Sequence, residues 1–150
     1  MNMEITTRKA NGFDATRIGE LLQSWLLETE FNYPGVCPYS HVWLADFIYK
    51  NPCFVILVND LIVGTIGLRY GNFPWNNEFP AFFCDFLIID SNYRTNGISA
   101  RIIDEVKKLS DGTKVPLFMG IMTGSLADKK DRFLEMTGFK YAGGNFVYGV

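Results

Sequence analysis

The feature that most constrains this sequence is a buried-strand pattern that runs directly into a polar turn and then into a helical pattern. Residues 81–89 (AFFCDFLII) are apolar except for one aspartate, as expected of a strand covered on both faces. Residues 90–96 form a polar turn, and from Ile98 apolar residues recur at helical spacing. The first N–H groups of a helix lack partners within it and carry the positive end of its dipole. The junction therefore predicts a phosphate-binding turn, with a plain structural turn as the alternative.

The remaining segments predict an alternation of strands and helices. Strands are expected over residues 3–9, 53–58, 61–70, 81–89, 115–123 and 139–150, the last as a strand or short hairpin. Helices are expected after Asp14 and Ser40 as N-caps, after Asn96, and over residues 128–137 up to Gly138. Asn59-Asp60 is typical of a tight hairpin turn, whereas residues 71–80 are interpreted as a long loop. The order β-α-α-β-β-β-α-β-α-β(β) predicts an α/β fold with a mixed central sheet.

Composition limits the class of protein. The chain has 150 residues, of which 48% are hydrophobic and 20% charged, so one domain with a proper core is expected and no linker divides it. A net charge of -2 without a run of Lys or Arg argues against nucleic acid and membranes as partners. Three cysteines and one histidine without recognisable spacing predict no metal site. The polar N-terminus and the lack of a membrane-spanning stretch predict a cytoplasmic protein.

The phosphate turn resembles the acetyl-CoA-binding motif of the Gcn5-related N-acetyltransferases (GNATs), written R/Q-x-x-G-x-G/A. Arg94, Gly97 and Ser99 occupy its three defining positions, and Ser99 replaces one small residue with another. The preceding residues 88–93 (IIDSNY) are similar to the end of the family's fourth strand, except that Ser91 stands where proline is usual. This segment carries most of the resemblance.

Two other segments and the element order agree with the same family. Residues 59–64 (NDLIVG) are similar to its second-to-third strand hairpin, and residues 133–139 (FLEMTGF) resemble its helix-to-strand ending L-Y-E-x-x-G-F. The resemblance covers nearly the whole chain. It implies a single N-acetyltransferase domain over residues 1–150, with a central sheet that splays between its fourth and fifth strands.

The resemblance also implies acetyl-CoA as co-substrate and the residues that bind it. The pantetheine arm would hydrogen-bond to the main chain of the fourth strand at Leu87, Ile88 and Ile89. The pyrophosphate would rest on the turn that follows, at Arg94, Thr95, Asn96, Gly97, Ser99 and Ala100. An acceptor amine would then attack the thioester directly.

Asp85 is the candidate general base, because a lone carboxylate in an apolar strand is costly unless it is paired or functional. Period-two alternation places it on one face with Phe83, Leu87 and Ile89. A salt bridge with a neighbouring element is the alternative explanation. Glu78, in the predicted loop, is a second candidate for the base.

The general acid is where the sequence departs from the family. Its frequent tyrosine and asparagine align with Leu134 and Ala127, and neither side chain can donate a proton. Tyr148 is the preferred substitute and Tyr141 the weaker one, with packing of each tyrosine in a strand as the alternative. The missing acid favours a second hypothesis, a catalytically weak acyl-CoA-binding or scaffold module. A toxin-like enzyme acting on charged tRNA is disfavoured by the acidic composition.

The acceptor is expected to lie between residues 28–43 and 73–79. These segments combine aromatic rings with acids, an arrangement that suits a cationic amine: Tyr33, Tyr39, Trp43, Trp75, Glu28, Glu30 and Glu78. A polyamine, an amino sugar and a peptide N-terminus all fit this composition. Whether the protein forms a homodimer is left open.

Overall fold

The structure, a computed structural model, describes residues 3–28, 40–73, 75–94, 97–120 and 127–142, with the main chain alone at 127–131. Its strands are β1 (Ile5–Lys9), β2 (Cys53–Val58), β3 (Leu61–Phe73), β4 (Asn76–Ile89) and β5 (Leu117–Met119). Its helices are α1 (Ala15–Glu28), α2 (His41–Lys50), α3 (Ile98–Thr113) and α4 (Ala127–Met136), with 3-10 turns η1 (Gly12–Asp14) and η2 (Ser91–Tyr93).

The strands form one sheet in the order β1-β2-β3-β4-β5 within the described part of the chain. The first four strands pair antiparallel with their neighbours, whereas β5 runs parallel to β4 and is reached through α3. A parallel pair requires such a crossover, because both strands begin at the same end of the sheet and the chain has to return to that end between them. The predicted α/β fold with a mixed sheet is therefore confirmed.

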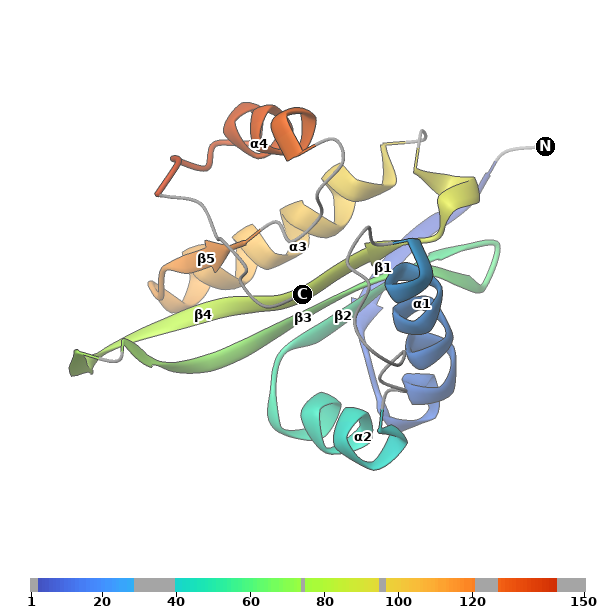
Figure 1. The fold of residues 1–150 in the computed structure, drawn as a ribbon, viewed down its shortest axis with the longest axis horizontal. Helices are drawn as coiled ribbons and strands as arrows, with labels where there is room; N and C mark the ends of the chain where they lie inside the picture. Colours follow the sequence, from blue (N-terminus) through green and yellow to red (C-terminus); the bar gives the residue numbers. More distant parts are fainter. Residues whose placement is uncertain (1–2, 29–39, 74, 95–96, 121–126, 143–150) are drawn as a thin grey trace.

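Helices cover both faces of the sheet (Figure 1). On one face, α1 and α2 pack through Ile18, Leu44 and Phe47 against a cluster that includes Phe86 and Ile88 of β4. On the other, α3 contributes two fully buried isoleucines and a valine to a second cluster: Ile98, Ile102 and Val106. Because both faces are covered, the central strands are nearly continuously apolar, as the sequence predicted.

Local signals in the sequence set most of the element ends. Ser40 caps α2 by accepting a hydrogen bond from the Trp43 N–H, and Asn59 and Asp60 form the tight turn between β2 and β3 with φ of 47° and 66°. Asp14 is not the N-cap that was expected. Asn11 caps η1, and Asp14 instead accepts two hydrogen bonds from Arg8, at 2.7 and 2.9 Å.

The largest correction concerns residues 71–80, which were interpreted as a loop. Both strands continue through this segment, so that β3 and β4 form a long hairpin in which Asn72 pairs with Pro80 and Phe73 with Asn76. In Figure 1 this hairpin extends well beyond the helices. Aromatic side chains at neighbouring positions of the two strands stabilise the hairpin. The segment also contains several turn-forming residues, which is why it was interpreted as a loop.

The C-terminal part agrees only in outline with the prediction. The strand expected over residues 115–123 is described at Leu117–Met119. Helix α4 ends at Met136, and Gly138 just beyond it has the left-handed φ of 97° that was predicted. Residues 139–142 are not in a strand, and the rest of the predicted terminal strand lies outside the described residues. None of the helices in the described ranges has the length and apolar character that crossing a membrane requires.

Candidate functional site

Strand β4 is paired differently along its two halves. Its Phe82, Phe83 and Cys84 pair with β3 on one side and with Leu117–Met119 of β5 on the other. Beyond Cys84, no described strand lies on the β5 side of β4. Within the described part of the chain, the last five residues of β4 therefore present an open main-chain edge, as the predicted splay of the sheet requires.

The open edge begins at a β-bulge centred on Asp85. Gly67 of β3 pairs with Phe86 and Leu68 pairs with Cys84, so Asp85 has no partner of its own. The bulge reverses the alternation of side chains. Leu87 and Ile89 join Phe82 and Cys84 on the α3 face, while Phe86 and Ile88 pack under α1 and α2. The prediction that Asp85 shares a face with Leu87 and Ile89 is wrong, because strict alternation cannot include a bulge.

Hydrogen bonding to β3 determines which main-chain groups the open edge presents. The Asp90 N–H donates to the Val63 carbonyl at 2.8 Å, which makes these residues a hydrogen-bonded pair. Such pairs alternate along an antiparallel ladder. Consequently Ile88 directs its main-chain groups toward β3, and Leu87 and Ile89 direct theirs toward the open edge. Of the three residues predicted to bind the pantetheine arm, the outer two thus direct main-chain groups toward this edge, and Ile88 does not.

The phosphate turn connects this edge to α3. Asp90 caps η2 by accepting a hydrogen bond from the Asn92 N–H at 3.0 Å, and Gly97 begins α3 with φ of 69° and ψ of 9°. The fully buried Ile98 anchors the start of the helix. Ser99 and Ala100 follow in the first turn, where N–H groups lack acceptors within the helix. Thr95 and Asn96 lie outside the described residues.

Arg94 is directed away from the first turn of α3. Its Nε donates to the Ile89 carbonyl at 3.0 Å, and its Nη2 pairs with Glu28 at the end of α1. The Ile89 carbonyl is thus occupied, which leaves the Ile89 N–H and both main-chain groups of Leu87 on the open edge. Arg94 ties the end of β4 to α1, so a contact with phosphate depends on its remaining Nη1 or on its main chain.

Asp85 forms an ion pair with Arg69 of β3. Its Oδ2 accepts a hydrogen bond from Nε at 3.1 Å, and its Oδ1 accepts one from Nη2 at 3.3 Å. The Asp85 side chain is 28% exposed and that of Arg69 56%. Because the carboxylate has this partner, its position in an apolar strand does not by itself require a catalytic role.

Arg69 was not among the functional residues predicted from the sequence. Its relation to Asp85 follows from the pairing of β3 with β4, and that pairing was hidden when residues 71–80 were interpreted as a loop. The signal that could have revealed it is the aromatic content of the hairpin, with Phe73, Trp75 and Phe79 on either side of its turn.

Tyr148 lies outside the described residues, as do Glu30, Tyr33 and Tyr39 of the expected acceptor region. Tyr141 is 67% exposed. Leu134 is half-buried on α4, and Ala127 begins that helix.

Two other side chains of β4, those of Glu78 and Cys84, have surroundings that bear on a catalytic role. Glu78 is exposed on β4 near the tip of the hairpin, and not in a loop. Cys84 donates a hydrogen bond to the Phe86 carbonyl at 3.4 Å, and burial raises the pKa of its thiol to about 12. A thiol with this pKa is protonated at neutral pH and is a poor nucleophile. No group of His, Cys, Asp and Glu within the described ranges is placed to hold a metal ion.

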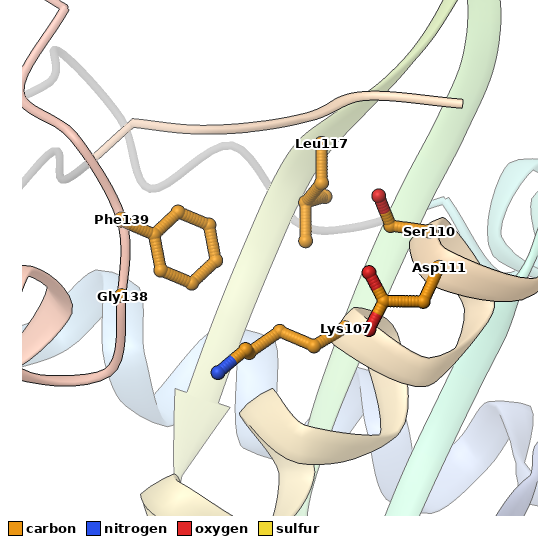
Figure 2. A pocket seen from close by; sticks show the side chains of 6 residues that line it. All are labelled: Lys107, Ser110, Asp111, Leu117, Gly138 and Phe139. Carbon is orange, nitrogen blue, oxygen red and sulfur yellow. The ribbon is translucent and has the colours of Figure 1, made fainter. Parts of the chain in front are cut away.

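A cavity of about 150 Å³ lies at the other end of α3, between that helix, β5 and the residues after α4 (Figure 2). Lys107 extends across it and donates to the Thr137 carbonyl at 2.6 Å, so its charge stabilises the C-terminus of α4. Ser110 and Asp111 line the cavity from the last turns of α3, which carry the negative end of the helix dipole. This cavity is therefore a poor site for a phosphate.

Comparison with known proteins supports the fold. No protein-family model and no curated protein sequence matches this chain. Solved structures match over nearly its whole length. A GNAT-family acetyltransferase from Streptococcus pneumoniae has a TM-score of 0.74 and 17% identity, covering 93% of this chain and 87% of that one. A ribosomal-protein-alanine N-acetyltransferase from Brucella melitensis biovar Abortus 2308 has a TM-score of 0.68 and 13% identity, covering 99% of each chain.

A third solved structure is named for a small-molecule acceptor. It is an aminoglycoside acetyltransferase from an uncultured soil metagenomic sample, with a TM-score of 0.69 and 17% identity, covering 99% of this chain and 96% of that one. The same protein was also solved in complex with sisomicin. At these identities the similarity shows the fold, and the expectation drawn from the turn and its flanking segments is confirmed at that level.

Proposed function

Because the chain has the fold of the Gcn5-related N-acetyltransferases, we propose that it transfers an acetyl group from acetyl-CoA to a primary amine. One observation carries the proposal: the open edge of β4 leads, through a single turn, to the N-terminus of α3. An edge of unpaired main-chain groups and a helix N-terminus suit the two polar parts of acetyl-CoA, its pantetheine amides and its pyrophosphate.

Binding of acetyl-CoA uses these two elements together. Amides of the pantetheine arm add to β4 like a short strand, with the main chain of Leu87 and the N–H of Ile89 as partners. The pyrophosphate accepts hydrogen bonds from the N–H groups of the turn and of Ser99 and Ala100. Gly97 supports this approach because its positive φ orients the turn at little cost.

The chemistry is a direct acyl transfer at the bulge. The amine nitrogen attacks the thioester carbonyl, a C–N bond forms, the C–S bond breaks, and the CoA thiolate leaves. Asp85 lies at the start of the open edge, and its carboxylate takes a proton from the acceptor ammonium, directly or through water. Tyr148 protonates the leaving thiolate. Holding the amine and thioester together accounts for much of the rate enhancement.

A small-molecule or peptide amine is the proposed acceptor. The solved relatives include enzymes named for both kinds, an aminoglycoside acetyltransferase and a ribosomal-protein-alanine N-acetyltransferase. Cys53 and Cys84 are free thiols, which suits a protein of the cytoplasm.

The second candidate is an acyl-CoA-binding module with weak catalysis. Leu134 and Ala127 favour it, because Leu134 cannot supply the proton of the family's tyrosine and Ala127 cannot form the hydrogen bonds of its asparagine. The two candidates share the acetyl-CoA site and differ only in turnover.

Thermal unfolding with and without acetyl-CoA tests the binding part of the proposal. A ligand that binds only the folded state at about 100 times its Kd stabilises it by about 2.7 kcal/mol. Thiol release from acetyl-CoA with a panel of amines then tests the transfer. A stabilised protein that releases no thiol with any amine would support the binding module, and a protein that acetyl-CoA does not stabilise would contradict both candidates.

A further inference from the structure

The Arg69–Asp85 pair lies beside a group of aromatic rings, which we call the aromatic cluster and which consists of Phe73, Trp75, Phe83 and Phe118. The Arg69 guanidinium carbon lies 5.3 Å from the centre of the Phe83 ring. That ring stacks on Phe118 of β5, with centroids 5.7 Å apart. The pair and the cluster therefore form one continuous surface, placed where the open edge of β4 begins.

Two hydrogen bonds and a ring fix the position of Arg69. Its Nε and Nη2 donate to Asp85, and its plane lies near Phe83. No hydrogen bond within the described residues engages its Nη1. The side chain is also 56% exposed, so this donor edge is accessible to a ligand. A guanidinium fixed in this way loses little conformational entropy when it binds a carboxylate.

The pairing of Asp85 with Arg69 changes which amines fit the site. A purely cationic amine that approaches Asp85 also places its charge beside the guanidinium, and like charges at this distance repel. An amine with a carboxylate on the adjacent carbon avoids this. Its ammonium faces Asp85 while its carboxylate faces Nη1 of Arg69, so that each charge of the ligand meets the opposite charge of the pair.

On the premise of the proposed acetyl transfer, we propose that the acceptor is a free α-amino acid with a large apolar or aromatic side chain. Arg69 binds its carboxylate, Asp85 receives its ammonium, and the aromatic cluster contacts its side chain. Phe73, Phe83 and Phe118 are half-buried, and Trp75 is 81% exposed at the edge of the cluster. Exposed and half-buried rings of this kind bind apolar side chains well.

The test compares three acceptors that differ only at the carboxylate: L-phenylalanine, L-phenylalaninamide and phenethylamine. Thiol release from acetyl-CoA is measured with the full chain after acetyl-CoA binding has been established by thermal shift. We expect kcat/KM for phenylalanine to exceed that of the other two by about 10- to 100-fold, the usual range for a charge-assisted hydrogen bond. Equal rates for the three would overturn the inference and leave the proposed transferase intact.

The matching variant is Arg69→Met, which keeps an unbranched side chain over Phe83 and removes the charge. Its kcat/KM for phenylalanine should fall by about 10- to 100-fold, while that for phenethylamine stays level or rises because repulsion is removed. Lys108→Met, which removes an exposed charge on α3, should change neither value. A purely structural Arg69 would lower both acceptors equally and so contradict the inference.

Two further outcomes are decisive. Acetyl-CoA stabilisation without thiol release from phenylalanine would overturn the inference alone. Failure of acetyl-CoA to stabilise the chain would instead remove the proposed function on which the inference depends.

Discussion

The two halves of β4 have similar compositions and different environments. Residues 82–84 are paired on both sides, with β3 and β5, and their main-chain groups are used within the sheet. Residues 85–89 are equally apolar apart from Asp85, yet among the described residues they are paired only with β3. The proposed acetyl-CoA site therefore depends on main-chain groups that have no strand partner among the described residues, a property that side-chain composition does not reveal.

The bulge at Asp85 separates the two halves and has a structural support. Gly67 lies opposite Phe86, and a Cβ atom added there would come within 2.3 Å of the Phe86 ring. Glycine at this position lets the ring lie across β3 and so holds the register shift in place. The same shift places Asp85 beside Arg69 and starts the open edge.

The largest expected effect comes from Asp85→Asn, which removes the charge of the residue at the bulge and keeps the shape of its side chain. If Asp85 is the base, kcat should fall by about 10²- to 10⁴-fold while acetyl-CoA binding is unchanged. Steady-state thiol release and thermal shift measure the two quantities. Asp46→Asn, which removes another ion-paired aspartate on α2, is the control. Wild-type turnover in the Asp85 variant would make that residue structural.

Gly97→Val tests the turn that follows the open half. A β-branched residue is strained at a φ of 69°, and reorienting the turn should weaken acetyl-CoA binding by about 100-fold or more, removing most of a ligand stabilisation of about 2.7 kcal/mol. The control is Gly112→Val near the end of α3, where an added Cβ also meets open space and φ is not positive. If both variants retain the full ligand-induced shift, the phosphate does not bind at this turn.

Gly67→Ala tests whether the bulge is held by close packing. The added methyl group overlaps the Phe86 ring, so the free energy of unfolding should fall by about 2 kcal/mol. Gly71→Ala, in the same strand but with nothing within 4 Å of the added Cβ, should change it by less than about 1 kcal/mol. Urea unfolding of both variants measures the difference, and equal stabilities would mean that Phe86 can move away without cost.

Tyr148→Phe tests the proposed acid and removes only a hydroxyl group. Turnover should fall by about 10-fold and the alkaline limb of the pH–rate profile should shift, while stability changes little. The effect is smaller than at Asp85 because a thiolate is a fair leaving group even without an acid. An unchanged profile would assign protonation of the thiolate to water.

The last prediction concerns Cys84, the last residue paired on both sides, and has no effect at neutral pH. Burial raises the pKa of its thiol from 9.0 to about 12, so the folded state retains a proton that the unfolded chain releases. The contribution of this thiol to the free energy of unfolding is complete below pH 9 and is lost as pH rises from about 9 toward 12. The difference in unfolding free energy between wild type and Cys84→Ala should therefore change by about 1 kcal/mol per pH unit in this range. A constant difference would contradict the burial of the thiol.

Much of the fold could be predicted because its signals are local. The caps at Ser40 and Gly138, the turn at Asn59-Asp60 and the helical spacing from Ile98 each depend on a few neighbouring residues. Residues 71–80 were misread because cross-strand aromatic contacts, which join residues distant in sequence, stabilise strands there despite turn-forming residues.

The sequence by itself determined the junction of strand, polar turn and helix, and with it the resemblance that predicted the fold. It also identified Asp85 as an unusual charge within an apolar strand. Only the tertiary structure decided that a bulge reverses the side chains after Asp85, that Arg69 is its partner, and that Arg94 is held by Glu28. The physical reason is that these outcomes depend on strand register and on contacts between distant residues, which side-chain periodicity within one segment does not encode.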